Sequence, residues 1–426
     1  MRILTKLKNL NYLNEIMDIE LIASKLKASG NRSLIYLIFI LMIKFIKSIP
    51  YFIFENSRSD VLFLYATKNQ KDALLPISNS LKNKLKVANV SLNRSISSEY
   101  TVPIFYIHLT SLLFLPLIII EYFFIRDKER KMRMLHGFQD YALSLGNILV
   151  SYIFLRINNP KLIVVSNDHN SNIRSLLLAS RKLNIKSVYI QHASVSKLFP
   201  PLDQFDLALL DGCYAKDIYT SVGLLAKEVK LVGISKLDNA KKIVSKDETI
   251  EYKEKPIIGV ALNQLYDLSR LKILLSKIDI ENYLIKVRVH PNQMRVFSNL
   301  KNELRNFDIT WSDPLADGVD DFIISCSYII AGNSSILLEA AILRRIAIYY
   351  SMDSIPYDYY GYIKNGICIE MKVSLPSGFI DFEKYFFDNH NYNQIKYYDD
   401  SFGNQKYGRS SEYCSENISL FFDKVQ

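Results

Sequence analysis

The chain has 426 residues, 49% of them hydrophobic, and a formal net charge of +10. Single domains mostly stop growing below about 300 residues, so this length predicts two. The apolar fraction excludes a long disordered protein. The positive charge predicts an anionic partner, either a phosphorylated substrate or an acidic membrane surface. Nucleic acid is not expected, because the basic residues are scattered and form no recognisable module with aromatic residues.

The spacing of the cysteines and the composition of the N-terminal segment indicate the cellular compartment of the protein. The four cysteines are widely spaced, with no Cys-x-x-Cys pair and no metal-ligand rhythm with the six histidines. We therefore expect free thiols, mostly buried, in a reducing cytoplasm, and neither a bound metal nor a cofactor. The segment from Met1 to Leu13 is basic but is not followed directly by a short apolar core, so no signal peptide is expected.

Two apolar stretches, residues 34–54 and 102–125, raise the question of a membrane. About 20 apolar residues span a bilayer, so both are long enough. A basic run at 126–133 follows the second stretch and suits an anionic cytoplasmic surface. The alternatives are burial within the fold and true spanning, but one crossing would split a sheet between compartments. We expect peripheral association with the inner face of the cell membrane.

Short apolar runs alternate with helical patterns through the first half of the chain. The segments 69–85 and 173–183 have helical character, whereas the runs between such patterns have the length of strands. This alternation predicts parallel strands with crossover helices, that is, a doubly wound α/β domain. The predicted strands are 60–65, 87–92, 162–166, 187–191, 207–210 and 229–232.

The alternation restarts after a charged segment between residues 243 and 256, which reads as a linker. Further strands are predicted at 257–262, 284–289, 328–331 and 347–350. We therefore predict a first Rossmann-like domain over 1–245, which binds the acceptor, and a second over 256–426, which binds the donor. Two such domains face a central cleft, and part of the tail is expected to pack back across a domain.

Polar residues follow predicted strands of the first domain. Asp168, His169 and Asn170 come directly after one strand, and His192 follows the next. The carboxyl ends of parallel strands form the rim where ligands bind, so these side chains are candidates for a catalytic base. Asp168 and Asn170 could equally cap the next helix, which is a role that Asp and Asn fill well.

Two more polar clusters follow strands of the second domain. His290 and Pro291 end one strand, and the segment Ala331-Gly332-Asn333-Ser334-Ser335 ends the next and leads into an apolar segment that carries Glu339. Hydroxyl groups, backbone amides and an imidazole at this rim can bind a phosphate. The serines could instead serve only as a helix cap and Pro291 only as a strand end. The order of the two motifs, one βαβ unit apart, favours a nucleotide-phosphate site.

These motifs resemble the nucleotide-binding domain of GT-B glycosyltransferases, chiefly bacterial capsule and surface-polysaccharide enzymes. The similarity is to sialyltransferase-like proteins with "HP" and "SS" motifs and to polymerases that use CDP-glycerol. It covers residues 162–366. The resemblance implies a GT-B fold of α/β class with the catalytic candidates His192, Asp168 and His169. The donor-binding residues that it implies are Arg288, His290, Pro291, Gly332, Asn333, Ser334, Ser335 and Glu339.

The resemblance also implies an activity: inverting, metal-independent transfer of a sugar from a CMP- or CDP-linked donor to a capsule or lipopolysaccharide-type acceptor. Glu339 would contact the ribose or anchor its helix. Sialyltransferases of this kind carry an acidic pair before glycine in the first domain, whereas Asp211-Gly212 has one acid only. Alternatives are polyol-phosphate transfer of the CDP-glycerol type, a non-hydrolysing sugar-nucleotide epimerase, and a non-catalytic nucleotide-sugar-binding protein.

Overall fold

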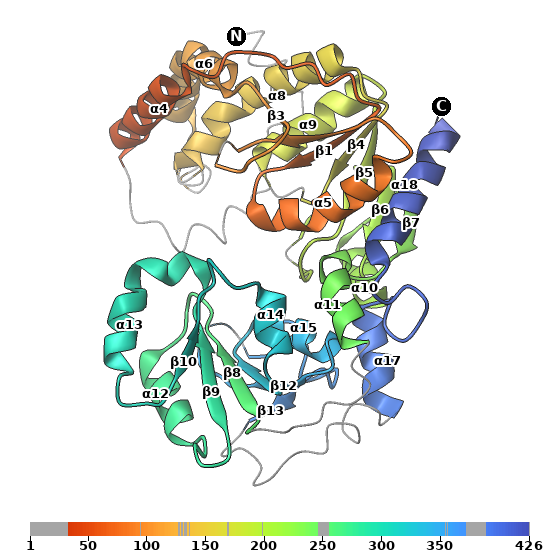
Figure 1. The fold of residues 1–426 in the computed structure, drawn as a ribbon. Coiled ribbons are helices and arrows are strands. Elements are labelled where there is room, and N and C mark those ends of the chain that lie inside the picture. Colours follow the sequence, from red (N-terminus) through yellow and green to blue (C-terminus); the bar gives the residue numbers. More distant parts are fainter. Residues whose placement is uncertain are drawn as a thin grey trace.

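The computed structural model describes residues 33–425, apart from 94, 127, 129–130, 132–133, 136, 168–169, 198, 246–254, 354, 356 and 372–388. Two parallel β-sheets, each flanked by helices, lie one above the other in Figure 1. This is the predicted α/β architecture of two doubly wound domains. The predicted linker falls largely outside the described residues.

The first sheet has seven strands in the order β3-β2-β1-β4-β5-β6-β7, and all of its strand pairs are parallel. Its inner strands are buried on both faces, which explains their unbroken apolar runs. The strands are β1 (Val61–Tyr65), β2 (Val87–Ser91), β3 (Tyr100–Thr101), β4 (Leu162–Val165), β5 (Lys186–Ile190), β6 (Leu207–Leu210) and β7 (Glu228–Leu231). The helices are α4 (Leu34–Ser48), α5 (Lys68–Leu81), α6 (Ile104–Phe124), α8 (Phe138–Asn158), α9 (Ser171–Lys182) and α10 (Cys213–Val222). Helix α11 (Asp238–Val244) follows β7 but packs into the core of the second domain.

The second sheet has six parallel strands in the order β10-β9-β8-β11-β12-β13. The strands are β8 (Ile257–Ala261), β9 (Leu284–Arg288), β10 (Thr310–Ser312), β11 (Tyr328–Ala331), β12 (Ile346–Tyr349) and β13 (Ile369–Glu370). The helices are α12 (Leu268–Ser276), the 3₁₀ helix η2 (Pro291–Val296), α13 (Phe297–Glu303), α14 (Val319–Ile324), α15 (Ile336–Ile342), α17 (Asn389–Tyr398) and α18 (Ser410–Val425). The sequence did not reveal β3, β10 and β13, since two or three residues make no apolar run.

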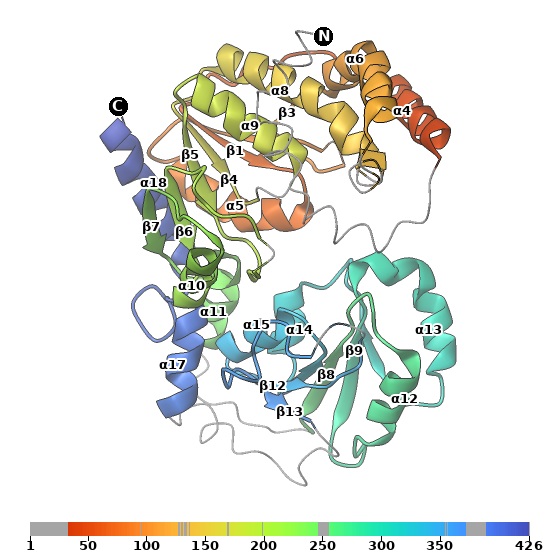
Figure 2. The same ribbon diagram turned by 180° about the vertical axis from the view of Figure 1, so that it is seen from behind.

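The C-terminal helix α18 packs against the first domain, beside α5 (Figure 1, Figure 2). Its Cys414, Ile418 and Phe422 recur at helical spacing and enter the core formed by β1, β4, β5 and β6. The hydroxyls of Ser80 on α5 and Ser415 on α18 are hydrogen-bonded at 2.9 Å. The tail therefore crosses back from the second sheet to the first. All four cysteines are free, and three are buried.

Helices α4, α6 and α8 form a small core of their own at one end of the first domain. Leu41 of α4, Ile118 of α6 and Phe138 of α8 are buried in it. By length and composition α6 could cross a membrane, and only 22% of its most apolar window is buried. One such helix is weak evidence for a span. The two predicted apolar stretches are thus helices that pack together on one side and expose apolar residues on the other.

Candidate active site between the two domains

The carboxyl ends of the second sheet bring the predicted donor-binding residues to one rim. Strand order reverses between β8 and β11, and such a switch point is where open α/β sheets bind ligands. The register aligns Ala261, Arg288 and Ala331 at the ends of β8, β9 and β11. Strands lie about 4.8 Å apart, so the backbones after β9 and β11 are roughly 10 Å apart. That span suits a nucleotide held at both ends.

His290 is the N-cap residue of η2, and Pro291 is the first residue of that helix. The His290 Nδ1 accepts a hydrogen bond from the Asn292 amide at 3.2 Å and lies 3.3 Å from the Gln264 side-chain nitrogen. Burial lowers the pKa of His290, which favours the neutral ring. With Nδ1 accepting, the proton of the neutral ring resides on Nε2. His290 can therefore donate from Nε2 to a phosphate oxygen.

Arg288 makes internal hydrogen bonds in the second domain. Its guanidinium donates to the Ser312 hydroxyl at 2.7 Å and to the Asp317 carbonyl oxygen at 2.9 Å. Burial lowers the pKa of Arg288, while Asp317 and the neighbouring carboxylates raise it. The side chain is only 8% exposed, so these internal contacts hold the end of β9.

Gly332 and Asn333 shape the turn after β11. A Cβ at Gly332 would meet the Asp353 carboxylate, which the Asn333 amide holds in place, so a side chain here would force Asp353 to move. The Asn333 amide donates to Asp353 at 2.8 Å, and its side-chain oxygen accepts from the Tyr359 amide at 2.8 Å. Both residues therefore position the loop that presents Ser334 and Ser335.

Ser334, Ser335 and Glu339 lie at the start of α15. Ser334 and Ser335 are half-buried, and the Ser335 hydroxyl donates to Glu339 at 3.3 Å. Glu339 is buried and forms an ion pair of 2.5 Å with Lys236, which comes from the segment after β7 in the first domain. Burial alone would lower the pKa of Lys236, but the Glu339 carboxylate raises it overall. The serines and the ion pair thus join the two domains at one point.

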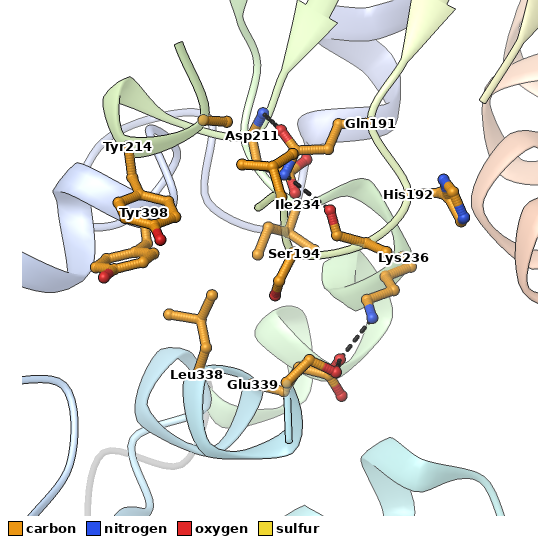
Figure 3. Close-up of a pocket in the computed structure, with 14 residues that line it drawn as sticks. Gln191, His192, Ser194, Asp211, Tyr214, Ile234, Lys236, Leu338, Glu339 and Tyr398 are labelled. Atoms are coloured by element: carbon orange, nitrogen blue, oxygen red, sulfur yellow. Dashed lines mark hydrogen bonds and ion pairs between the residues drawn. The ribbon is translucent and has the colours of Figure 1, made fainter. Parts of the chain in front are cut away.

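A cavity of about 20 Å³ lies at this junction, lined by both domains (Figure 3). The first domain contributes residues that follow β5, β6 and β7, and the second contributes the first turns of α15 and Tyr398 of α17. The cavity holds about one water molecule, so a nucleotide would occupy the rim above it rather than the cavity itself. The polar residues that line it are Gln191, His192, Ser194, Asp211, Tyr214, Lys236, Ser335, Glu339 and Tyr398.

His192 follows β5, as predicted, and lines the cavity. In Figure 3 its ring points away from Tyr214 and Tyr398. Its Nδ1 is buried without a hydrogen-bond partner among the described residues. Burial, with the nearby charge of Lys236, lowers the pKa of His192 to about 4. The sequence suggested a base with a pKa near the ambient pH, whereas the structure gives a weaker base that is neutral throughout the physiological range.

Asp211 is a candidate functional residue that was not among those predicted from the sequence. It follows β6 as His192 follows β5, so the strand-end rule applied to every strand would have found it. Its amide donates to the Gln191 side chain at 3.0 Å. Burial and then the Asp399 carboxylate raise the pKa of Asp211 well above its usual value, which favours a neutral acid that can donate a hydrogen bond.

Asp168 and His169 lie outside the described residues, so the structure does not place them. Their neighbour Asn170 is the N-cap residue of α9, but its side chain makes no capping hydrogen bond. Among the described residues no group of three or more His, Cys, Asp and Glu side chains is arranged to hold a metal ion. The described part of the site thus combines His192, Asp211 and Lys236 with Ser335 and Glu339 in one lining, in which Lys236 faces Glu339.

Comparisons with known proteins concern the fold alone. No family model and no curated protein matches the sequence. A UDP-GlcNAc 2-epimerase from Neisseria meningitidis is similar in structure, with a TM-score of 0.54 and 12% identity over 84% of this chain and 99% of that one. A putative UDP-N-acetylglucosamine 2-epimerase from Listeria monocytogenes gives a TM-score of 0.55 and 11% identity over 86% and 97%. The wall teichoic acid polymerase TagF, with 14% identity over 91% and 98%, has a TM-score of 0.46, too distant to bear on the site. The chain has a two-domain GT-B-like fold.

Proposed function

We propose that the chain is an inverting, metal-independent glycosyltransferase that uses a nucleotide-activated donor. One observation carries this proposal: residues chosen separately from the two halves of the sequence, His192 on one side and Ser335 with Glu339 on the other, line the same cavity between the domains. A donor on the second-domain rim and an acceptor in the first domain would meet there. The sequence resemblance favours a CMP- or CDP-linked donor and a capsule or lipopolysaccharide-type glycan acceptor.

In this reaction each of the two domains has its own role. His192 takes the proton from the acceptor hydroxyl as its oxygen attacks the anomeric carbon and the bond to the nucleotide phosphate breaks. The leaving phosphate gains negative charge, which hydrogen bonds from His290 Nε2 and the Ser334 hydroxyl stabilise, while the Ser335 hydroxyl donates to Glu339. Lys236 adds a positive charge at the same junction. Glu339 holds Lys236 in place. Of the two roles that the sequence suggested for Glu339, this is nearer to anchoring its helix than to contacting the ribose.

A second candidate is a non-hydrolysing sugar-nucleotide epimerase, because solved structures with this fold include UDP-GlcNAc 2-epimerases. An epimerase acts on the nucleotide sugar alone, whereas a transferase needs an acceptor. Incubation with a nucleotide sugar and no acceptor separates the two, because an epimerised nucleotide sugar would identify the second candidate. Polyol-phosphate transfer would appear as a phosphodiester product, and a binding protein would give no product.

His290→Ala and the double change Ser334→Ala with Ser335→Ala are expected to weaken nucleotide binding. A hydrogen bond to a charged group contributes about 1.5–3 kcal/mol, so each variant should bind roughly 10- to 150-fold more weakly. Calorimetric titration measures this directly. Ser276→Ala is the matched control, since among the described residues that hydroxyl donates to Ile273 of its own helix α12. Wild-type affinity in both site variants would remove these residues from the donor site.

We further propose that the exposed faces of α4 and α6 hold the enzyme on an anionic membrane. Apolar side chains recur on α4 at helical spacing and continue on α6, and basic residues flank them at both ends. The exposed apolar residues are Ile35, Phe39, Met42, Ile46, Leu113, Ile120, Phe123 and Phe124. Exposed Lys47, Arg126 and Lys128 supply the charge. In this proposal the first domain lies against a glycolipid acceptor at the inner face of the membrane.

The membrane proposal predicts that the protein sediments with vesicles containing anionic lipid at low salt and is released at high salt. Phe39→Ser with Phe123→Ser is expected to reduce partitioning by at least tenfold, because each buried Phe contributes about 1.5–3 kcal/mol. Leu420→Ser is the control, since it removes an equally exposed apolar side chain from α18. Absence of the wild type from the vesicle fraction at low salt would contradict the proposal.

A further inference from the structure

A second, larger cavity lies inside the first domain, away from the junction of the two domains. Its volume is about 440 Å³, which is within the range of small-molecule sites. Helices α4, α6 and α8 form one side of it, and the segments after β2 and β4 form the other. Strand order in the first sheet reverses between β1 and β4, so the cavity lies beside that sheet's switch point. Asn170, one of the polar residues that the sequence placed after a strand of the first domain, lines it.

One nitrogen of a buried imidazole in this cavity has no hydrogen-bond partner among the described residues. His108 of α6 lines the cavity and is only 9% exposed, and its Nδ1 makes no hydrogen bond with any residue that the structure describes. A buried polar atom normally has a partner, so this one requires an explanation. Burial and the nearby Lys44 ammonium lower the pKa of His108 to about 4, so the ring is neutral. A bound polar group would satisfy Nδ1.

The rest of the lining combines polar and charged groups with apolar side chains. The first turn of α9, Asn170 to Asn172, lines the cavity, and the Asn170 side chain does not cap that helix. A helix N-terminus favours an anion, and Lys44 adds a full positive charge to the same lining. Val102, Ile104, Ile107 and Leu143 supply apolar surface on the side of α6 and α8.

We propose that this cavity binds the phosphate-bearing head of an amphiphilic acceptor. Lys44 and the first turn of α9 hold the phosphate, His108 adds a hydrogen bond, and the apolar chain leaves along α6 toward the exposed apolar faces of α4 and α6. Asp140 lies in the same lining and accepts hydrogen bonds from hydroxyls of the head group. This site rests on the proposed transferase function, for which it names the acceptor class.

Calorimetric titration of the full chain with octyl phosphate, inorganic phosphate and octyl glucoside tests the proposal. The wild type is expected to bind octyl phosphate at least tenfold more tightly than either other probe. Equal binding of inorganic phosphate would overturn the lipid assignment, and equal binding of octyl glucoside would overturn the phosphate assignment. No binding of octyl phosphate would overturn the site altogether.

Variants locate the binding. Lys44→Gln and Asn172→Asp are expected to weaken octyl phosphate binding at least tenfold. Asn172→Asp keeps the oxygen that accepts from the Ile173 amide and suits a helix N-terminus, so the fold should persist while the new charge repels phosphate. Lys182→Gln, in the last turn of α9 and outside the cavity lining, is the matched control. Wild-type binding in both test variants would overturn the proposal.

A parallel titration with nucleotide separates this proposal from the proposed function. Octyl phosphate binding without any nucleotide binding would leave the cavity established and the transferase function wrong. Nucleotide binding without octyl phosphate binding would do the reverse, because the two sites share no lining residue.

Discussion

Replacing His192 by glutamine is expected to lower turnover by about 10²- to 10⁴-fold, the usual contribution of a general base. Nucleotide affinity should stay within about twofold of the wild type, because the donor site lies on the second domain and His192 on the first. Glutamine keeps a polar side chain of similar size at the end of β5. Full turnover of His192→Gln in a transfer assay would exclude His192 as the base.

The pH profile gives an independent readout of the same residue. Burial lowers the pKa of His192 from 6.5 to about 4, and a base works only when it is deprotonated. Activity due to His192 should therefore persist as the pH falls through 6.5 and decline only near pH 4. A decline of kcat/KM centred near pH 6.5 would instead point to another histidine, such as His169.

The second large effect, a loss of folding stability, is expected where the C-terminal segment returns to the first domain. Lys241 of α11 and Asp399 form an ion pair of 2.6 Å, and both side chains are fully buried. Asp399 also accepts hydrogen bonds from the amides of Ile234 and Ser401. Removing one partner of a buried pair leaves an uncompensated charge, so Asp399→Ala should lower the free energy of unfolding by about 3–5 kcal/mol.

Adjacent Asp400 offers a matched control. It pairs with Lys406 at the same 2.6 Å, but the two side chains are 23% and 26% exposed. Asp400→Ala should therefore cost about 1 kcal/mol or less. Removing both buried charges, as Lys241→Met with Asp399→Asn, is expected to recover part of the loss. Denaturant unfolding measures all three, and an Asp399→Ala variant no less stable than Asp400→Ala would show that the pair does not anchor the joint.

The central strands could be predicted from sequence because each is buried on both faces. β4 and β11, for example, are unbroken apolar runs of four residues bounded by polar segments. Strand order could not be predicted, since it depends on which strands pair across long separations. The apolar runs of α4 and α6 were equally visible, but whether they cover a core or face solvent depends on their packing with α8, which the sequence does not reveal.

The site was predictable only where the residues follow a strand. His192, His290 and Ser335 satisfy that rule, and the structure brings His192 and Ser335 to one cavity. Lys236 was not predicted from the sequence. Its place in the cavity lining depends on an ion pair with Glu339, which lies 103 residues away in the sequence. The internal hydrogen bonds of Arg288 could not be predicted either, since its partners Ser312 and Asp317 lie beyond the next helix in the sequence.

Nucleotide binding at the rim of the second sheet is measured by calorimetric titration of the wild-type protein with CMP, CDP, UDP and GDP. We expect saturable binding at one site per chain, tightest for a cytidine nucleotide and at least tenfold weaker in His290→Ala. Tighter binding of UDP would favour the epimerase candidate. If none of the four nucleotides binds saturably, the rim of the second sheet is not a nucleotide site.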